Sequence, residues 1–454
     1  MSALLTVDAG VRASFSGDAS GLRMIPDSVA RPAASAEVAA LLREASATRT
    51  PVTAAGAQTS TTGASITSRG TLLSLRGLDR ILDVDVTRRI ARVECGVRIG
   101  DLQRAIAVEG LMFAPDPTSE EECTIGGAIA CNASGARSLR YGVTRAHVAG
   151  VTVALASGDV ATYRRSRLEK NTVGYAAVHD PVDWFVGSEG TLGVVLEAEL
   201  ALIPRPARVT GLAIPFASER AALEFVVAAR ESALAPRCLE YFDASALALA
   251  RAADGDAGWA RDAAALVYTE DASDAPDAPL DDWLALVEAH GGSGDDLRVF
   301  EGEAALRDAR RLRHAVPAGM HARAAPFLAH GGRRVSTDWA VPYRLVADLI
   351  ARSRATAERM GVEPAVTYGH AGNGHPHQNY VARDPDHLAR LEQVVEATLI
   401  DVIAHGGTVA AEHGIGKLKR RWLPLQLSPT QLGVMRAIKA ELDPLGILAP
   451  GNVL

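Results

Sequence analysis

PDPTSEEECTIGGAIACNASGARSLRYG, residues 115–142, is a glycine-rich interruption in an otherwise regular run of strand-like and helix-like segments. A stretch of this length inside a compact domain is usually either a functional loop or a disordered one. Its small and apolar residues favour an ordered loop that faces a ligand. Successive backbone N–H groups in such a loop can hold a pyrophosphate, because small side chains permit close approach.

Three further segments belong with this stretch. They are PVTAAGAQTSTTGAS (51–65), KNTVGY (170–175) and WFVGSEGTLGVVLEAEL (184–200). None fits the dinucleotide fingerprint of a strand, GxGxxG and a helix. Each alone is weak evidence, because glycine-rich loops are often plain turns. Their occurrence together, in this order, is the stronger signal.

In this combination the chain resembles the vanillyl-alcohol-oxidase and p-cresol-methylhydroxylase (PCMH) type of FAD-binding domain. It is most similar to the glycolate oxidase subunit, D-lactate dehydrogenase and D-2-hydroxyglutarate dehydrogenase branch. The resemblance implies an α+β fold, with a two-subdomain PCMH-type FAD-binding domain in residues 24–205. A ferredoxin-like α+β substrate (cap) domain and a short helical carboxy-terminal segment would follow in residues 206–454. The implied activity is that of an FAD-linked D-2-hydroxyacid dehydrogenase or oxidase.

The resemblance also implies the cofactor contacts. The expected pyrophosphate contacts are Gly56, Ala57, Gln58, Thr59 and Ser60. The residues expected to line the cofactor are Pro117, Thr118, Gly126, Gly127, Asn132, Ser134, Gly135, Glu189, Gly190 and Gly193, with Val195 on the adenine side. Residues 55–58 depart from the arginine-glycine-glycine-glycine form of the relatives, although binding through the backbone survives that change. The loop lacks the histidine of covalently flavinylated relatives, so non-covalent FAD is expected.

Length and composition set the broad class. A chain of 454 residues with 48% hydrophobic and 22% charged residues predicts a two-domain globular protein. A net charge of −7 argues against nucleic-acid binding, which needs a basic face. Four cysteines without CxxC spacing predict reduced, buried thiols. No secretory signal or transmembrane run is evident, so a cytoplasmic protein is expected.

Periodicity predicts the main elements. The predicted helices cover 35–46 (with Ser35 as N-cap), 99–111, 219–233 and 387–407, and the predicted strands cover 71–75, 89–97 and 148–158. The acidic, alanine-rich residues 253–296 are predicted to form surface loops and helices. Two prolines in 201–211 indicate a domain boundary.

A second signal is YGHAGNGHPHQNY (368–380), followed by GGTVAAEHGIGKLK (406–419). Imidazole nitrogens with a carboxylate oxygen suit a catalytic divalent metal. Glycines and Pro376 exclude a helix here, so an irregular loop is predicted to bring His370 and His377 together. The alternative is a pair of surface loops with ordinary hydrogen-bonding histidines. Three histidines within eight residues and a Glu-His dipeptide favour the metal.

The family resemblance extends to these segments. It implies His370, His377 and Glu412 as ligands of a divalent metal, zinc being the expected ion, with His413 as the acid/base. Asn379 is implied as a contact of the substrate or of the metal ligands. His375 stands where the relatives usually have asparagine, and either adds a ligand or donates a hydrogen bond.

A substrate carboxylate is best held by a planar guanidinium. The segment ARRLRHAVPAGM (309–320) resembles the family stretch that supplies one, which indicates Arg313. The alternative is a solvated basic helix face, because two more arginines stand beside it. Arg333 and Arg334 are reserve candidates.

These expectations combine into one reaction. Arg313 orients the carboxylate, the metal binds the C2 hydroxyl, and His413 removes its proton as the hydride passes to flavin N5. The expected partners are a small 2-hydroxy acid and an electron acceptor, which is a quinone, an electron-transfer flavoprotein, a cytochrome or oxygen. A homodimer is left open. Two alternatives are an alkylglycerone-phosphate-synthase-like transferase and a flavin-binding subunit of a larger oxidase.

Overall fold

The computed structural model describes residues 4–166, 168–256, 258–273 and 280–454. The chain forms two compact units. Unit 1 comprises Met1–Gly135, Gly142–Arg205 and Glu412–Leu454, and unit 2 comprises Ala136–Tyr141 and Pro206–Ala411. The segment 206–454, predicted as one domain, therefore contributes its end to unit 1. Both units mix helices and sheets, which confirms the predicted α+β class.

The described residues of unit 1 form three sheets. The first has the order β1 (Leu5–Thr6), β2 (Ser28–Ala30), β4 (Thr71–Ser74), β3 (Val52–Ala55). The second is antiparallel, with the order β5 (Ile81–Asp85), β6 (Ile90–Glu94), β10 (Val194–Ala201), β8 (Val148–Ala154), β9 (Val160–Arg164). The third pairs β7 (Leu111–Met112) with β11 (Ile203–Pro204). The three strands predicted from the sequence are confirmed as β4, β6 and β8.

The helices of unit 1 follow the predicted pattern with two corrections. They are α1 (Ala9–Ser14), α2 (Ser35–Thr48), α3 (Ile99–Ala107), α4 (Ile125–Cys131), α6 (Thr144–His147), α7 (Val182–Phe185), α14 (Leu423–Gln426) and α15 (Pro429–Leu442). Ser35 is not the N-cap of α2, because that position falls on Ala34, whose N–H is bound by the Glu37 carboxylate. The predicted loop 115–142 contains α4, which begins where the Thr124 hydroxyl accepts a hydrogen bond from the Gly127 N–H.

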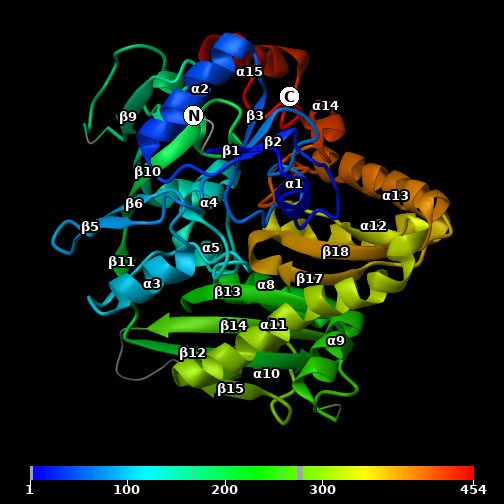
Figure 1. Ribbon diagram of the computed structural model, residues 1–454. Helices are drawn as coiled ribbons and strands as arrows, with labels where there is room; N and C mark the ends of the chain where they lie inside the picture. The colour runs from blue at the N-terminus through cyan, green and yellow to red at the C-terminus, as the bar shows by residue number, and fades with distance from the viewer. Residues whose placement is uncertain (1–3, 167, 257, 274–279) are drawn as a thin grey trace. The chain divides into compact units, whose positions relative to one another are not determined.

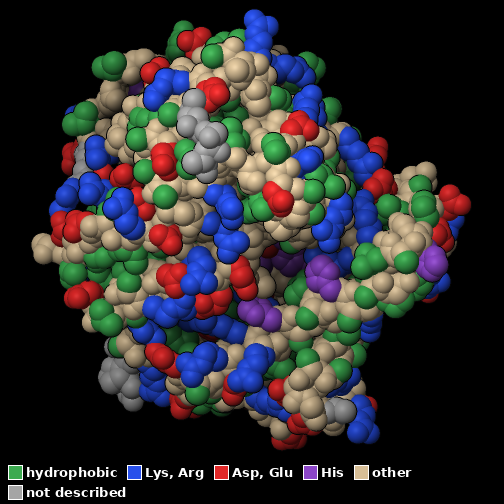
Figure 2. Space-filling model, in the orientation of Figure 1, with side chains coloured by type: hydrophobic (Ala, Val, Ile, Leu, Met, Phe, Trp, Pro, Cys, Tyr) green, Lys and Arg blue, Asp and Glu red, His purple; other side chains and the backbone are tan. Residues whose placement is uncertain are grey.

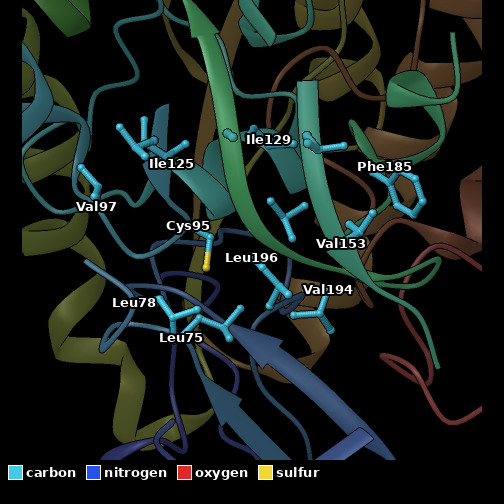
Figure 3. Close-up of a cluster of buried hydrophobic side chains, with 14 of the residues drawn as sticks. Leu75, Leu78, Cys95, Val97, Ile125, Ile129, Val153, Phe185, Val194 and Leu196 are labelled. Atoms are coloured by element: carbon cyan, nitrogen blue, oxygen red, sulfur yellow. The ribbon is translucent and has the colours of Figure 1, made fainter. Parts of the chain in front are cut away.

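The core of unit 1 lies between the five-stranded sheet and α4. Figure 3 shows Ile125 and Ile129 of α4 among Val153, Val194 and Leu196 of the strands. Cys95 lies in the same cluster, and burial raises the pKa of its thiol to about 12. All four cysteines are free thiols, as predicted, and Cys131 is the half-buried one.

Unit 2 is built on a seven-stranded antiparallel sheet. Its order is β15 (Arg298–Glu301), β12 (Arg208–Phe216), β14 (Ala265–Ser273), β13 (Pro236–Asp243), β17 (Val366–His370), β18 (His375–Ala382), β16 (Arg333–Ser336), and Figure 1 shows β12, β14 and β13 side by side. Strand β14 corrects the prediction of surface loops and helices for 253–296, because a sheet neighbour on either side overrides its acidic composition. Residues 257 and 274–279 of that range lie outside the described residues.

Helices cover both faces of this sheet. On one face, α9 (Ala244–Asp254) and α11 (Gly302–Ala324) pack against Phe242 and Tyr368. On the other, α8 (Glu219–Glu231) and α12 (Val346–Arg359) bind Tyr241 and Gln378 through Glu219 and Ser353. Helix α10 (Leu280–Ala289) contacts α8, and α13 (Pro385–Ala404) contacts α12. The helices predicted at 219–233 and 387–407 are confirmed as α8 and α13.

The surface carries both signs of charge. Figure 2 shows acidic and basic side chains intermingled on the face in view. Within the described part of the chain, no helix combines the length and apolar character needed to cross a bilayer.

Candidate active site

The histidine-rich segment forms a β-hairpin. Strand β17 ends at His370 and β18 begins at His375, with a short turn between them. The register sets His370 opposite His375 and Tyr368 opposite His377. The predicted irregular loop is therefore wrong, because the glycines interrupt the chain mainly at the turn. The every-second-residue spacing of His375, His377 and Asn379 was the strand signal.

The three imidazoles of the hairpin converge on one side of the sheet. The ring centroids of His370 lie 5.4 Å from His375 and 5.2 Å from His377, and those of His375 and His377 are 4.6 Å apart. One ring nitrogen of each lies within 4.8 Å of the others, and all three residues are buried. Gly369 makes this possible, since a Cβ there would lie 2.7 Å from His377 Cδ2.

A buried carboxylate stands behind His370. Glu240 of β13 places Oε1 2.6 Å from His370 Nδ1 and Oε2 3.1 Å from Arg313 Nε. Burial favours protonation, but His370 and Arg313 outweigh it and hold the pKa of Glu240 below its ordinary value. An ionised Glu240 accepts the Nδ1 proton of His370, which leaves Nε2 as the nitrogen with the lone pair a metal requires.

His375 has a carboxylate partner of its own. Its Nε2 lies 3.1 Å from Oδ1 of Asp338, which is buried. Asp338 also accepts the N–H of Ala411 at its backbone oxygen (2.8 Å) and at Oδ2 (3.2 Å). This contact is an ion-pair distance, and within the described residues His375 Nε2 forms no hydrogen bond, so both predicted roles of His375 stay open. Sequence reasoning missed both Glu240 and Asp338, although a carboxylate inside the apolar strand CLEYFD (238–243) was a signal for the first.

The other predicted site residues of unit 2 have distinct surroundings. Arg313 lies on α11 and is paired with Glu240. Arg333 lies on β16 and pairs with Glu392 at 3.1 Å. Asn379 is buried on β18, and within the described ranges its side-chain amide has no hydrogen-bond partner.

Glu412 and His413 belong to unit 1. Glu412 Oε2 accepts a hydrogen bond of 3.1 Å from Ser134 Oγ, and its Oε1 lies 3.4 Å from His413 Nε2. The backbone oxygen of His413 accepts from Thr62 Oγ1 at 3.3 Å. The predicted metal ligands are therefore divided at the peptide bond between Ala411 and Glu412, with the histidines in unit 2.

The loop after β3 supplies backbone donors. Within the described part of the chain, the N–H groups of residues 57–61 donate to no protein group. Gln58 has a φ of 59°, and its side-chain amide donates to the carbonyls of Phe15 (3.0 Å) and Gly17 (3.1 Å). The side chain thus holds the loop while the main chain presents donors, an arrangement that binds anions such as a pyrophosphate.

Glycines of unit 1 allow close packing of its loops. A Cβ at Gly56 would lie 2.2 Å from Thr124 Oγ1, and one at Gly135 would lie 2.1 Å from the Asp116 carbonyl oxygen. A Cβ at Gly126 would lie 2.8 Å from Cys95 Cβ. No side chain larger than hydrogen fits at these positions without a shift.

Two further predicted cofactor residues, Glu189 and Asn132, make hydrogen bonds within unit 1. Burial raises the pKa of Glu189, whose carboxylate accepts the N–H groups of Ile415 (2.5 Å) and Gly416 (2.7 Å). Asn132 Oδ1 accepts the Arg145 N–H at 2.9 Å. These side chains hold backbone segments, so any contact they make with a cofactor remains a prediction.

Two family matches define the class of this chain. Residues 26–164 match the family described as an FAD binding domain, and residues 205–453 match the C-terminal domain of FAD linked oxidases. The protein is therefore an FAD-linked oxidoreductase. It belongs to the FAD-linked oxidase family.

The curated relatives cover nearly the full chain. A glycolate oxidase subunit, GlcD, of Bacillus subtilis is 33% identical over 94% of this chain and 89% of its own length. A D-lactate dehydrogenase of Archaeoglobus fulgidus is 32% identical, over 94% and 91%. A D-2-hydroxyglutarate dehydrogenase of Xanthomonas citri pv. viticola is 31% identical, over 94% and 89%.

Solved structures share the fold at low identity. A p-cresol methylhydroxylase has a TM-score of 0.75 at 14% identity, covering 100% of this chain and 94% of its own. An alkyldihydroxyacetonephosphate synthase has a TM-score of 0.74 at 17% identity, covering 99% and 83%. These values confirm the PCMH-type fold and carry no argument about the reaction.

Proposed function

We propose that the chain oxidises a small D-2-hydroxy acid, of the D-lactate, glycolate or D-2-hydroxyglutarate type, to the 2-oxo acid. The observation that carries this proposal is the cluster of three buried imidazoles with Glu240 behind His370. Imidazoles oriented by carboxylates are typical of metal sites that polarise a substrate oxygen. The names of the relatives add support, because glycolate, D-lactate and D-2-hydroxyglutarate are all 2-hydroxy acids.

His370, His377 and Glu412 would hold the divalent metal, with zinc as the expected ion. When bound, such a metal lowers the pKa of a coordinated hydroxyl. Glu240 fixes the tautomer of His370 for this role. Within unit 2, Asp338 holds the N–H of Ala411, the last residue of this unit before Glu412.

His413 is the proposed proton acceptor for the substrate hydroxyl. Its Nε2 lies 3.4 Å from Glu412 Oε1. FAD, when bound, supplies the hydride acceptor at flavin N5. The donors of residues 57–61 and the small residues Gly56 and Gly135 fit a pyrophosphate-containing cofactor, which we propose to be non-covalent.

Arg313 remains the predicted ligand of the substrate carboxylate. Its ion pair with Glu240 gives it a second role, because it neutralises the carboxylate that orients His370. Asn379 is proposed to bind a polar group of the substrate, since its amide is buried without a described hydrogen-bond partner, two positions after His377 on β18.

The decisive experiment measures reduction of the bound flavin by candidate substrates. The purified protein is mixed anaerobically with D-lactate, L-lactate, glycolate and D-2-hydroxyglutarate while the visible absorbance is recorded. We expect bleaching by at least one of these acids, and by the D rather than the L enantiomer of lactate. Absence of bleaching with every acid would contradict the proposed oxidation.

The metal assignment has its own test. Metal content is measured in the unaltered protein, in His370→Ala and in His405→Ala, whose imidazole bonds to Asp401 on α13. We expect His370→Ala to lose the metal and His405→Ala to keep it. Unchanged metal in His370→Ala would refute the ligand set. Full turnover in His413→Ala would remove only the proton-acceptor role.

A second candidate is a flavin-binding subunit of a larger oxidase, because the relatives from Bacillus subtilis and Escherichia coli are both named as a subunit. Turnover of the isolated chain with an artificial electron acceptor distinguishes the two. Full turnover alone favours the independent enzyme, whereas turnover that requires another polypeptide favours the subunit. The mass of the purified protein in solution tests the homodimer.

A further inference from the structure

Arg334 lies on the same face of the unit 2 sheet as the histidine hairpin. Strand β16 pairs with β18 so that Arg334 is opposite Val381 and Ser336 is opposite Asn379. Paired residues of neighbouring strands point to the same side, and residues two apart on one strand do so as well. Arg334, Asn379 and His377 therefore share one face.

No described residue compensates the charge of Arg334 with an ion pair. Within the described ranges its guanidinium forms no ion pair, and burial lowers its pKa. Its positive charge also contributes to the lowered pKa of His321 on α11, where burial is the larger cause. A half-buried cation without a counter-ion destabilises the folded protein. Such a cation is expected in a binding site, where an anionic ligand supplies the counter-charge.

The other arginines near this face differ from Arg334. Arg313 is 3.1 Å from Glu240, and Arg237 binds Glu270 through two nitrogens at 2.9 and 2.6 Å. Both have a buried carboxylate partner within the sheet. The contrast singles out Arg334 as the arginine whose counter-charge is missing among these three.

Asn379 supplies an independent observation. Only 1% of its surface is exposed, and neither atom of its amide has a hydrogen-bond partner within the described residues. Leaving such a group unsatisfied in the interior of a protein destabilises the fold. It is a diagonal neighbour of Arg334 on adjacent strands, about 7–8 Å away between Cα atoms, so both side chains reach a common small ligand.

We infer that Arg334 binds a carboxylate of the substrate and that Asn379 hydrogen-bonds the polar atoms beside it. The inference rests on the proposed function and adds a specificity-determining residue to it. The carboxylate comes from one of two sources. It is the group next to the hydroxyl carbon, common to all 2-hydroxy acids, or it is the second carboxylate of a diacid.

The test compares Arg334→Ala with Arg333→Ala in the holoenzyme. Arg333 is its neighbour on β16 and is paired with Glu392, so it is a matched control for loss of one arginine from that strand. Binding of pyruvate and of 2-oxoglutarate to the oxidised enzyme is measured by calorimetry. We expect Arg334→Ala to raise the Kd of at least one acid about 10- to 100-fold, as expected for a lost charge-assisted contact. The Kd measured for Arg334→Lys should lie between those of the unaltered protein and of Arg334→Ala, because lysine keeps the positive charge but lacks the planar guanidinium.

The outcomes separate the two sources. A raised Kd for both acids supports the carboxylate next to the reacting carbon, and a raised Kd for 2-oxoglutarate alone supports the second carboxylate. Unchanged Kd for both acids in Arg334→Ala, with an unchanged melting temperature, would overturn the inference. An equal effect in Arg333→Ala would overturn it as well. Since the binding assay needs no turnover, it reports on Arg334 even when no acid bleaches the flavin and the proposed oxidation fails.

Discussion

The loop after β3 in unit 1 and the histidine hairpin in unit 2 are built in opposite ways. The loop presents main-chain N–H groups, while the Gln58 side chain serves to hold its shape. In the hairpin the main chain forms the β-ladder, and the side chains of His370, His375 and His377 converge. A site made of main chain tolerates changes of residue type, whereas a site made of side chains does not.

The largest expected effect is at the hairpin. We expect His377→Ala to lower turnover more than about 100-fold, because even residues behind a metal ligand cost 10- to 100-fold when replaced. Steady-state kinetics and metal analysis of the same preparation measure it, with flavin content as the control for an intact unit 1. Retained turnover and metal would show that the imidazoles are not the reactive site.

Acid should weaken unit 2 through its buried ion pairs. Glu270 on β14 is buried, which favours protonation, but Arg137 and Arg237 outweigh this and lower its pKa to about 2 from 4.5. Because the folded-state pKa is depressed, the stabilisation is complete above pH 4.5 and is lost as the pH falls towards 2. It amounts to about 3 kcal/mol.

Urea unfolding between pH 2 and 5 measures this effect. The pH dependence should be shallower in Glu270→Gln than in the unaltered protein. Glu224→Gln, at an exposed pair with Arg220, is the control and should keep the original slope. Equal slopes in all three proteins would contradict the role of Glu270.

A smaller effect is expected at the loop. Gly56→Ala places a Cβ 2.2 Å from Thr124 Oγ1, so the loop or the start of α4 must shift. We expect FAD affinity to fall about 10-fold, equivalent to about 1.4 kcal/mol. Gly433→Ala is the control, because a Cβ there meets nothing within 4 Å. Thr124→Ala in the Gly56→Ala background should restore part of the affinity, and failure to do so would place the effect elsewhere.

The smallest effect should come from Gln58→Ala. It removes side-chain hydrogen bonds to Phe15 and Gly17 but leaves the backbone donors in place. We expect a loss of stability of about 1–2 kcal/mol and a less than fivefold loss of FAD affinity. Equilibrium titration of the apoprotein with FAD checks this. A complete loss of FAD binding would show that the side chain, rather than the backbone, makes the contact.

The sequence predicts helices and strands whose apolar residues recur with a regular period better than elements that lack such a period. Helix α13 and strand β8 were predictable because their apolar residues recur with a regular period. Strand β14 was not, because the acidic residues around it resemble a surface segment while its pairing with β12 and β13 is remote in sequence. Helix α4 is too short to show a period.

The candidate site divides in the same way. The histidines could be named from their spacing, but their β-register depends on pairing that the glycines conceal. Glu240 and Asp338 lie far from the histidines in sequence, and only the fold brings them to His370 and His375. The sequence offered Arg313, Arg333 and Arg334 as candidates for binding the substrate carboxylate. The structure distinguishes Arg334 from the other two, because Arg313 pairs with Glu240 and Arg333 pairs with Glu392.

The return of the chain to β3 has a consequence for biosynthesis. The Val52 N–H donates to the Ile447 carbonyl at 2.8 Å, and the Ala449 N–H donates to the Val52 carbonyl at 2.7 Å. The strand that leads into the loop is therefore made early on the ribosome and gains this neighbour only after residues 447–449 have emerged. Proteins commonly fold from the amino terminus during synthesis. Residues 206–411 make up most of a separate unit and can fold before that point, whereas β3, at the end of the strand order of its sheet, keeps this edge unpaired until then.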